Sequence, residues 1–169
     1  MRLSEYTDYT LRVLMYCASN PDRLITIAEL AERHDVSKNH LTKIVNSLAR
    51  QGTLETTRGR GGGVRLALPP ERIGIGDVIR ASETDFRLVE CFDRNTNTCM
   101  LAAKCRLERL LDSALRAYFK ELDGATLADL VGAPPKSGLS AAEKTHEFAI
   151  AMPPKSIRAS AIMTAASGN

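Results

Sequence analysis

The sequence lacks any apolar run long enough to cross a membrane. Apolar residues make up 44% of its 169 residues, but no stretch of them approaches the ~20 that a spanning helix needs. A secretory signal peptide is not expected either, because Glu5, Asp8 and Arg12 interrupt the first apolar segment and no small-residue cleavage site follows it. We therefore expect a cytoplasmic protein without a membrane partner, in a compartment where thiols stay reduced.

Catalytic motifs are missing as well. The run Arg58-Gly59-Arg60-Gly61-Gly62-Gly63 lacks the Lys-Ser/Thr pair of a P-loop and does not open onto a helix, so nucleotide binding is poorly supported. No nucleophile–base pairing and no substrate-pocket composition stand out. We expect no enzyme activity. An enzyme that transfers electrons through an iron–sulfur cluster is the weakest of the functional hypotheses considered below.

Three of the four cysteines, Cys91, Cys99 and Cys105, lie within fifteen residues. The residues between the first two show no apolar periodicity, which predicts an irregular exposed loop within residues 83–105. Clustered thiols in a reducing compartment favour a metal or an iron–sulfur cluster over disulfides. A usual cluster site has four cysteines, so the fourth iron ligand must be another side chain or a small molecule. Glu108 is the local candidate, and zinc held by three cysteines and an acid is the alternative for the whole site.

Residues 1–82 have the pattern of a winged helix-turn-helix domain, so the fold class is mainly α with a small β-hairpin. We predict helices over residues 6–20, 26–34 and 37–51, the second opened by the capping box Thr26–Glu29 and the third capped by Ser37. Only a tight turn fits between the second and third helices. Strand-like residues 53–57 and 64–68 flank the glycine–arginine run and predict the wing.

Positive charge is concentrated in residues 37–66, which hold six Lys and Arg side chains against one acid, Glu55. Such a concentration of positive charge is typical of a protein that binds a polyanion. Because it falls within a predicted winged helix-turn-helix, it indicates that the polyanion is double-stranded DNA. The third helix is expected to meet base edges or flanking phosphates, and the hairpin the backbone or the minor groove. The candidate DNA contacts are Lys38, Asn39, His40 and Lys43 on the helix and Arg58, Arg60 and Arg65 on the hairpin.

The longest periodic stretch runs from Arg106 to Leu122 and predicts a helix with an apolar seam of nearly five turns. One small winged helix cannot cover that seam, so we expect it to pack against a second copy and form a homodimer. Two identical recognition helices related by the symmetry of a dimer imply an operator that is an inverted repeat. Residues 106–132 are thus predicted to hold a dimerisation helix and a short closing helix, and residues 133–169 a flexible tail.

Several of these motifs together give residues 1 to about 132 a family resemblance. The chain resembles the dimeric iron–sulfur winged-helix repressors that include the nitric-oxide sensor NsrR, the iron regulator RirA and the cluster-assembly regulator IscR. The matching motifs are Thr7-Asp8-Tyr9, Val36-Ser37-Lys38-Asn39-His40-Leu41, Arg58-Gly59-Arg60-Gly61-Gly62-Gly63-Val64-Arg65-Leu66, Gly76-Asp77-Val78, Glu90-Cys91-Phe92 and Leu127-Ala128-Asp129-Leu130. Thr7-Asp8-Tyr9, Ser37-Lys38-Asn39-His40 and Thr126-Leu127-Ala128-Asp129-Leu130 look most like the NsrR branch, although the cysteine loop also resembles the RirA type. Glu108 stands where IscR-like proteins have a histidine, which counts against the IscR branch.

The resemblance implies a repressor whose grip on its operator depends on a [2Fe-2S] or [4Fe-4S] cluster bound by Cys91, Cys99 and Cys105. It also implies that Asp8, reaching over from the partner subunit, is the fourth ligand. Nitric oxide would be the signal, since its attack on the cluster would release the loop between the winged helix and the dimer helix. An iron-responsive regulator of the same architecture is the second hypothesis.

Overall fold

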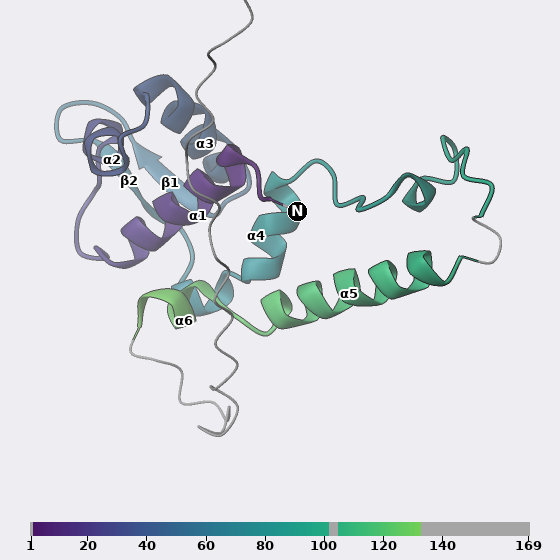
Figure 1. Cartoon of the computed structure of the whole chain (residues 1–169). Coiled ribbons are helices and arrows are strands. Elements are labelled where there is room, and N and C mark those ends of the chain that lie inside the picture. The colour runs from purple at the N-terminus through teal and green to yellow at the C-terminus, as the bar shows by residue number, and fades with distance from the viewer. Residues whose placement is uncertain (1, 102–104, 133–169) are drawn as a thin grey trace, which may run out of the picture. The chain divides into compact units, whose positions relative to one another are not determined.

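A computed structural model of the chain describes residues 2–101 and 105–132 (Figure 1). They belong to the first of two units into which the chain divides, residues 1–135 and 136–169. The predicted tail, residues 133–169, lies outside the described residues. In the part that is described, the protein is mainly helical with one two-stranded antiparallel sheet, which confirms the predicted fold class. None of the described helices is both long and apolar enough to span a bilayer.

Three helices form the helix-turn-helix: α1 (Glu5–Ala18), α2 (Ile27–His34) and α3 (Lys38–Arg50). Hydroxyl groups fix where each one begins. The side chains of Ser4, Thr26 and Ser37 accept hydrogen bonds from backbone N–H groups one turn further on. The Ser4 cap starts α1 one residue before its predicted start. Asp35 ends α2 in the left-handed conformation, with φ of 53°, so the chain reverses within a short turn.

The wing is the hairpin of β1 (Leu54–Thr57) and β2 (Gly63–Leu66), which pair antiparallel as the sequence predicts. Ile25 extends this small sheet, because its N–H donates to the Val64 carbonyl at 2.9 Å and its carbonyl accepts from the Val64 N–H at 2.8 Å. In the turn between the strands, Gly59 and Gly61 have φ of +98° and +80°. An L residue with a side chain would be strained in this conformation.

The core lies among α1, α2, α3, the hairpin and α4 (Ile75–Ser82). The last described helix, α6 (Leu127–Val131), packs into the same core, with Leu127 fully buried. Backbone hydrogen bonds tie it there: Leu127 N–H donates to the Ile73 carbonyl at 2.8 Å, and Ile75 N–H to the Ala125 carbonyl at 3.0 Å. A capping box of Thr126 and Asp129 opens the helix.

The long helix α5 (Arg106–Asp123) matches its predicted span within one residue, and none of its residues is buried. Its C-terminal end is fastened to α4. The Arg80 guanidinium donates two hydrogen bonds of 2.6 Å to the Asp123 carboxylate and lies 4.4 Å from the centre of the Phe119 ring. Two further short elements, the 3-10 turns η1 (Pro70–Arg72) and η2 (Glu90–Phe92), were not predicted from the sequence.

Candidate DNA-binding face and cysteine loop

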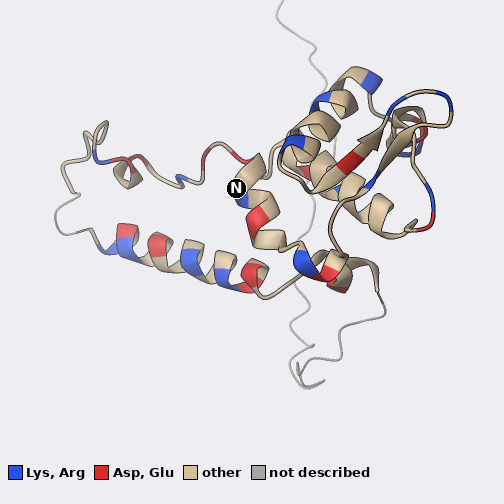
Figure 2. Cartoon of the chain, turned by 180° about the vertical axis from the view of Figure 1, so that it is seen from behind, with Lys and Arg blue, Asp and Glu red and all other residues tan. Residues whose placement is uncertain are grey.

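The outer face of α3 is polar and open. Lys38, Asn39 and Lys43 are exposed, and the apolar side chains of the helix point into the core. Figure 2 shows Lys and Arg spaced along α3 and again in the hairpin loop. This arrangement fits a recognition helix that meets DNA through the side chains at its N-terminal end.

His40 lies differently from its neighbours on α3. Its ring is half-buried against α1, with its centre 5.6 Å from that of Tyr9 in an edge-on contact and 6.4 Å from that of Tyr6 in a stacked one. The imidazole therefore joins the recognition helix to α1. A DNA contact by His40 stays a prediction.

On the hairpin, Arg58 and Arg60 are exposed at the turn, while Arg65 lies on β2. Arg65 is directly opposite Glu55 in the strand register and forms an ion pair with it. A phosphate would thus have to compete with Glu55 for Arg65, whereas Arg58 and Arg60 project from the turn. The wing offers two exposed cations at its turn and one that is already paired.

The three clustered cysteines are free thiols in three local settings. Cys91 is half-buried in η2, Cys99 is exposed, and half-buried Cys105 is the N-cap residue of α5. The described part of the predicted loop, residues 83–101 and 105, has no helix or strand apart from η2, and its residues are exposed or half-buried. Within residues 2–101 and 105–132, no three His, Cys, Asp or Glu side chains converge in a ready-made metal site. Residues 102–104, inside the loop, lie outside the described residues.

The charges around Cys91 nevertheless suit a bound cation. Partial burial raises the pKa of the Cys91 thiol, and the negative charges of Glu108, Cys105 and Cys99 raise it further. The charges of these groups thus act on Cys91, and a positive ion beside Cys91 would relieve that repulsion. Three thiols and one carboxylate are donors that fit an iron–sulfur cluster or zinc.

Asp8, the other candidate ligand, lies on α1 and pairs with Arg12, whose guanidinium approaches the Asp8 carboxylate to 2.8 Å. Within one chain the structure does not bring Asp8 together with the cysteines. Its predicted role needs a second subunit and stays a prediction. Glu108 is the acid whose charge reaches Cys91 in the same chain.

Sequence reasoning missed two contacts that organise the cysteine loop. The Glu90 carboxylate accepts two hydrogen bonds from Thr98, and the Arg87 guanidinium donates to Asp93 at 2.6 Å. The residue types were a partial signal, because Asp and Thr in loops commonly bond nearby backbone groups. The Glu90–Thr98 contact, between residues eight apart, could not be predicted from a helical or strand period.

A winged helix-turn-helix with an exposed basic face and a cysteine-bearing loop is the architecture of a DNA-binding regulator. Residues 3–133 match the Rrf2 family, described as an iron-dependent transcriptional regulator. The chain belongs to the Rrf2 family and is a transcriptional regulator, not an enzyme.

Its known relatives agree with this assignment. The HTH-type transcriptional regulator NsrR of Bacillus subtilis strain 168 is 50% identical over 132 residues, which cover 78% of this chain and 90% of NsrR. The oxidised form of Staphylococcus aureus CymR superimposes with a TM-score of 0.63 at 25% identity, covering 80% of this chain and 99% of CymR. IscR of T. potens, at 22% identity and a TM-score of 0.62 over 78% of this chain and 86% of its own, shows the fold alone. The predicted resemblance to NsrR-like regulators is confirmed.

Proposed function

We propose that this chain is a dimeric repressor that binds an inverted-repeat operator and releases it when nitric oxide reacts with an iron–sulfur cluster. Cys91, Cys99 and Cys105 would hold the cluster, as [2Fe-2S] or [4Fe-4S]. The observation that carries the proposal is the set of three free thiols in one loop, with Cys91 in electrostatic reach of the other two and of Glu108. When bound, the cluster supplies iron with which nitric oxide reacts.

The fourth ligand would be Asp8 of the second subunit or Glu108 of the same chain. The two acids make different demands on the protein. Asp8 would have to give up its ion pair with Arg12, whereas Glu108 stands one turn after Cys105 on α5. Asp8→Asn and Glu108→Gln therefore form a matched pair of variants. The one that shortens the lifetime of the cluster in anaerobic protein identifies the ligand.

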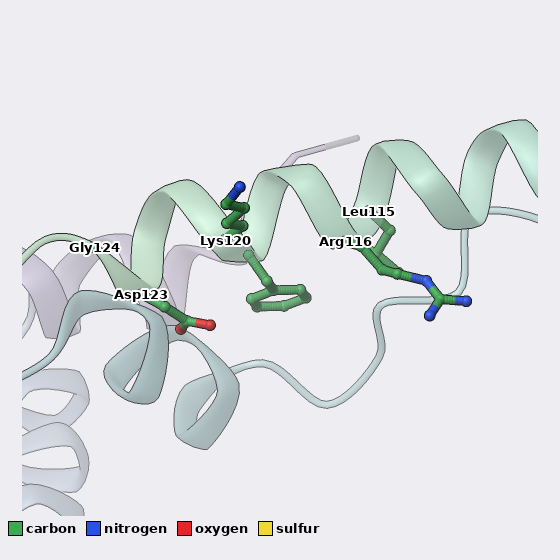
Figure 3. A pocket seen from close by; sticks show the side chains of 6 residues that line it. Leu115, Arg116, Lys120, Asp123 and Gly124 are labelled. Carbon is green, nitrogen blue, oxygen red and sulfur yellow. The ribbon is translucent and has the colours of Figure 1, made fainter. Parts of the chain in front are cut away.

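Dimerisation through α5 is supported by its open apolar seam. Leu107 and Leu110 are 57% and 65% exposed, which is unusual for leucines at helical spacing. Further along the helix, Leu115 and Phe119 line a shallow hollow of about 550 Å³ together with the side chains shown in Figure 3. A second copy packed on this seam would set the separation of two recognition helices.

The contacts of α5 suggest how the loop would act on DNA binding. Cys105 begins the helix, and the Arg80–Asp123 pair fastens its other end to α4. Directly after it, α6 is built into the core that also holds α3. A change of pose at Cys105 would therefore reach the recognition helix through packed elements, and the operator affinities of the two poses would differ.

The test is operator binding by protein that has been purified without oxygen. We expect iron, sulfide and a visible absorbance band, bleaching of that band by nitric oxide, and loss of DNA binding at the same gas dose. Arg60→Ala should weaken binding to all sequences and reduce its salt dependence, because a phosphate contact is lost. Colourless protein that holds zinc and binds DNA regardless of the gas would refute the proposal.

An iron-responsive regulator is the second candidate, and the description of the family as iron-dependent favours it. In that case cluster occupancy itself would be the signal. Iron chelation would free the operator at iron levels found in cells, whereas nitric oxide would not. Measuring both treatments on the same protein separates the two candidates.

A further inference from the structure

Side-chain and backbone contacts close the part of the cysteine loop between Glu90 and Thr98. Both the backbone N–H and the side-chain O–H of Thr98 lie 2.7 Å from the same oxygen of the Glu90 carboxylate. Glu90 directly precedes Cys91, and Thr98 directly precedes Cys99. The contact therefore joins the two points of the backbone from which the first two thiols project.

We propose that Glu90 and Thr98 are positioning residues, which hold Cys91 and Cys99 side by side before any metal or cluster binds. The inference rests on the proposed function for its purpose, since a loop closed in advance would capture and retain a cluster. The contact itself is formed by two side chains and one backbone N–H of the protein. We call the Glu90–Thr98 contact the loop clasp.

A second contact fixes one arm of the clasp. Arg87 donates to Asp93 at 2.6 Å and also forms an ion pair with Asp85 at 2.8 Å, so it joins η2 to the segment that leads into it. The Asp93 carboxylate in turn accepts a 3.0 Å hydrogen bond from the Asn95 N–H. On the other arm, the Cys99 N–H donates to the Asn97 side chain at 2.9 Å. Each end of the clasped loop thus has local support.

The benefit of such a clasp is entropic. Bringing together two thiols separated by several loop residues reduces the conformational freedom of the chain, and a metal that closed the loop would bear that loss. In a loop already closed by charge-assisted hydrogen bonds, this conformational entropy is lost when the protein folds, so metal binding does not have to offset it. The donors from Thr98 also occupy the Glu90 carboxylate, which lies beside Cys91 in the sequence.

The test measures how readily the two thiols act together in metal-free, full-length protein. Phenylarsine oxide bridges two nearby thiols by forming two As–S bonds and releasing one water, with no change in oxidation state. In a Cys105→Ser background, the thiols outside the core are Cys91 and Cys99, because Cys17 is buried. Capture is compared among Glu90→Ala, Thr98→Val, the conservative Thr98→Ser, and Glu71→Ala as a control that removes an exposed acid elsewhere.

We expect capture to slow about fivefold to tenfold in Glu90→Ala, and about threefold in Thr98→Val, which keeps the backbone donor. Thr98→Ser and Glu71→Ala should match the parent. Alkylation by iodoacetamide, which needs one thiol at a time, should not slow in any variant, and this separates positioning from simple access. Equal capture rates for Glu90→Ala and the parent would overturn the inference.

The outcome does not depend on which cofactor the protein holds. If Glu90→Ala slows capture while anaerobic wild-type protein contains no iron, the clasp stands and the proposed function fails. If the wild type holds a cluster and Glu90→Ala both captures the arsenical and retains the cluster like wild type, the function stands and the clasp fails.

Discussion

Glu29 shows how single side chains fasten the helix-turn-helix together. The Tyr16 hydroxyl donates to its carboxylate at 2.8 Å, and the Arg23 guanidinium donates to it at 2.9 Å. The pKa of Glu29 is lowered to about 2, first by the hydrogen bond from Arg23 and then by that from Tyr16. One carboxylate thereby joins α2 to α1 and to the segment between them.

This contact predicts how stability depends on pH. Because the pKa of Glu29 falls from 4.5 to about 2 on folding, its contribution is fully present above about pH 4.5 and is lost as the pH drops toward 2. Glu29→Gln should lower stability at pH 7 and flatten the acid dependence between those values, measured by urea unfolding at a series of pH values. Glu32→Gln, an exposed acid on the same helix, is the control. A Glu29→Gln profile parallel to wild type would contradict the prediction.

At the residue scale the sequence predicted what depends on near neighbours. The Thr26 and Ser37 caps were foreseen because a capping hydroxyl and its N–H partner lie three residues apart. The packing of His40 against Tyr6 and Tyr9 was not foreseen, since it joins α3 to α1 across about thirty residues. The Glu90–Thr98 clasp was missed because no helical or strand period relates its two partners.

Among the elements, the contact between α4 and α5 is unusually close at Gly76. A Cβ added to Gly76 would lie 1.9 Å from the Asp123 carboxylate and 3.0 Å from the Arg80 guanidinium. Glycine therefore allows the end of α5 to approach α4 and the Arg80–Asp123 pair to form. An alanine in a helix is otherwise favoured over glycine.

We predict that Gly76→Ala changes the free energy of unfolding in opposite directions in two backgrounds. In wild type, Gly76→Ala should destabilise, because it forces the Asp123 carboxylate off Arg80. In an Asp123→Ala background the nearest obstacle is gone, and the Arg80 side chain has lost its partner and can move aside. The same substitution should then stabilise by about 0.5–1 kcal/mol through helix propensity. Thermal or urea unfolding of the four proteins checks this as a double-mutant cycle. Equal effects in both backgrounds would show that the close approach does not limit the contact.

Leu127 makes a second prediction at this scale, because it places α6 in the winged-helix core. Leu127→Ala removes a fully buried side chain and should destabilise the protein by about 2–5 kcal/mol. Leu130, on the same helix and 42% exposed, is the control, and Leu130→Ala should change stability by about 1 kcal/mol or less. Equal losses for the two alanines would mean that α6 is not part of that core.

Predicted helix spans were accurate to within about two residues because apolar periodicity and caps are local. What α6 packs against was not predictable in that way. Leu127 has the same apolar character as Leu130. The backbone hydrogen bonds from Leu127 to Ile73 and from Ile75 to Ala125 place the start of α6 in the core, and Leu127 is the leucine that is buried there.

For the whole molecule, the open seam of α5 predicts that a second copy covers it. Leu107→Asp with Leu110→Asp should place two charges in the subunit interface, yield monomers in analytical ultracentrifugation and weaken operator binding at least about tenfold. Ser113→Asp, at an exposed position on the same helix but away from the seam, is the control and should remain dimeric. If the doubly substituted protein remained dimeric, the interface would lie elsewhere.

The sequence by itself determined the class of this protein: the order of helices and hairpin, the basic stripe, the three-cysteine loop and the long seam. Each is written in periodicity, caps or spacing, which act over a few residues. Only the tertiary structure decided that His40 packs on α1, that Glu55 already pairs with Arg65, that α6 completes the core, and that Glu90 reaches Thr98. Those contacts join residues whose separation along the chain has no fixed period, so their free energy arises only once the backbone has brought them together.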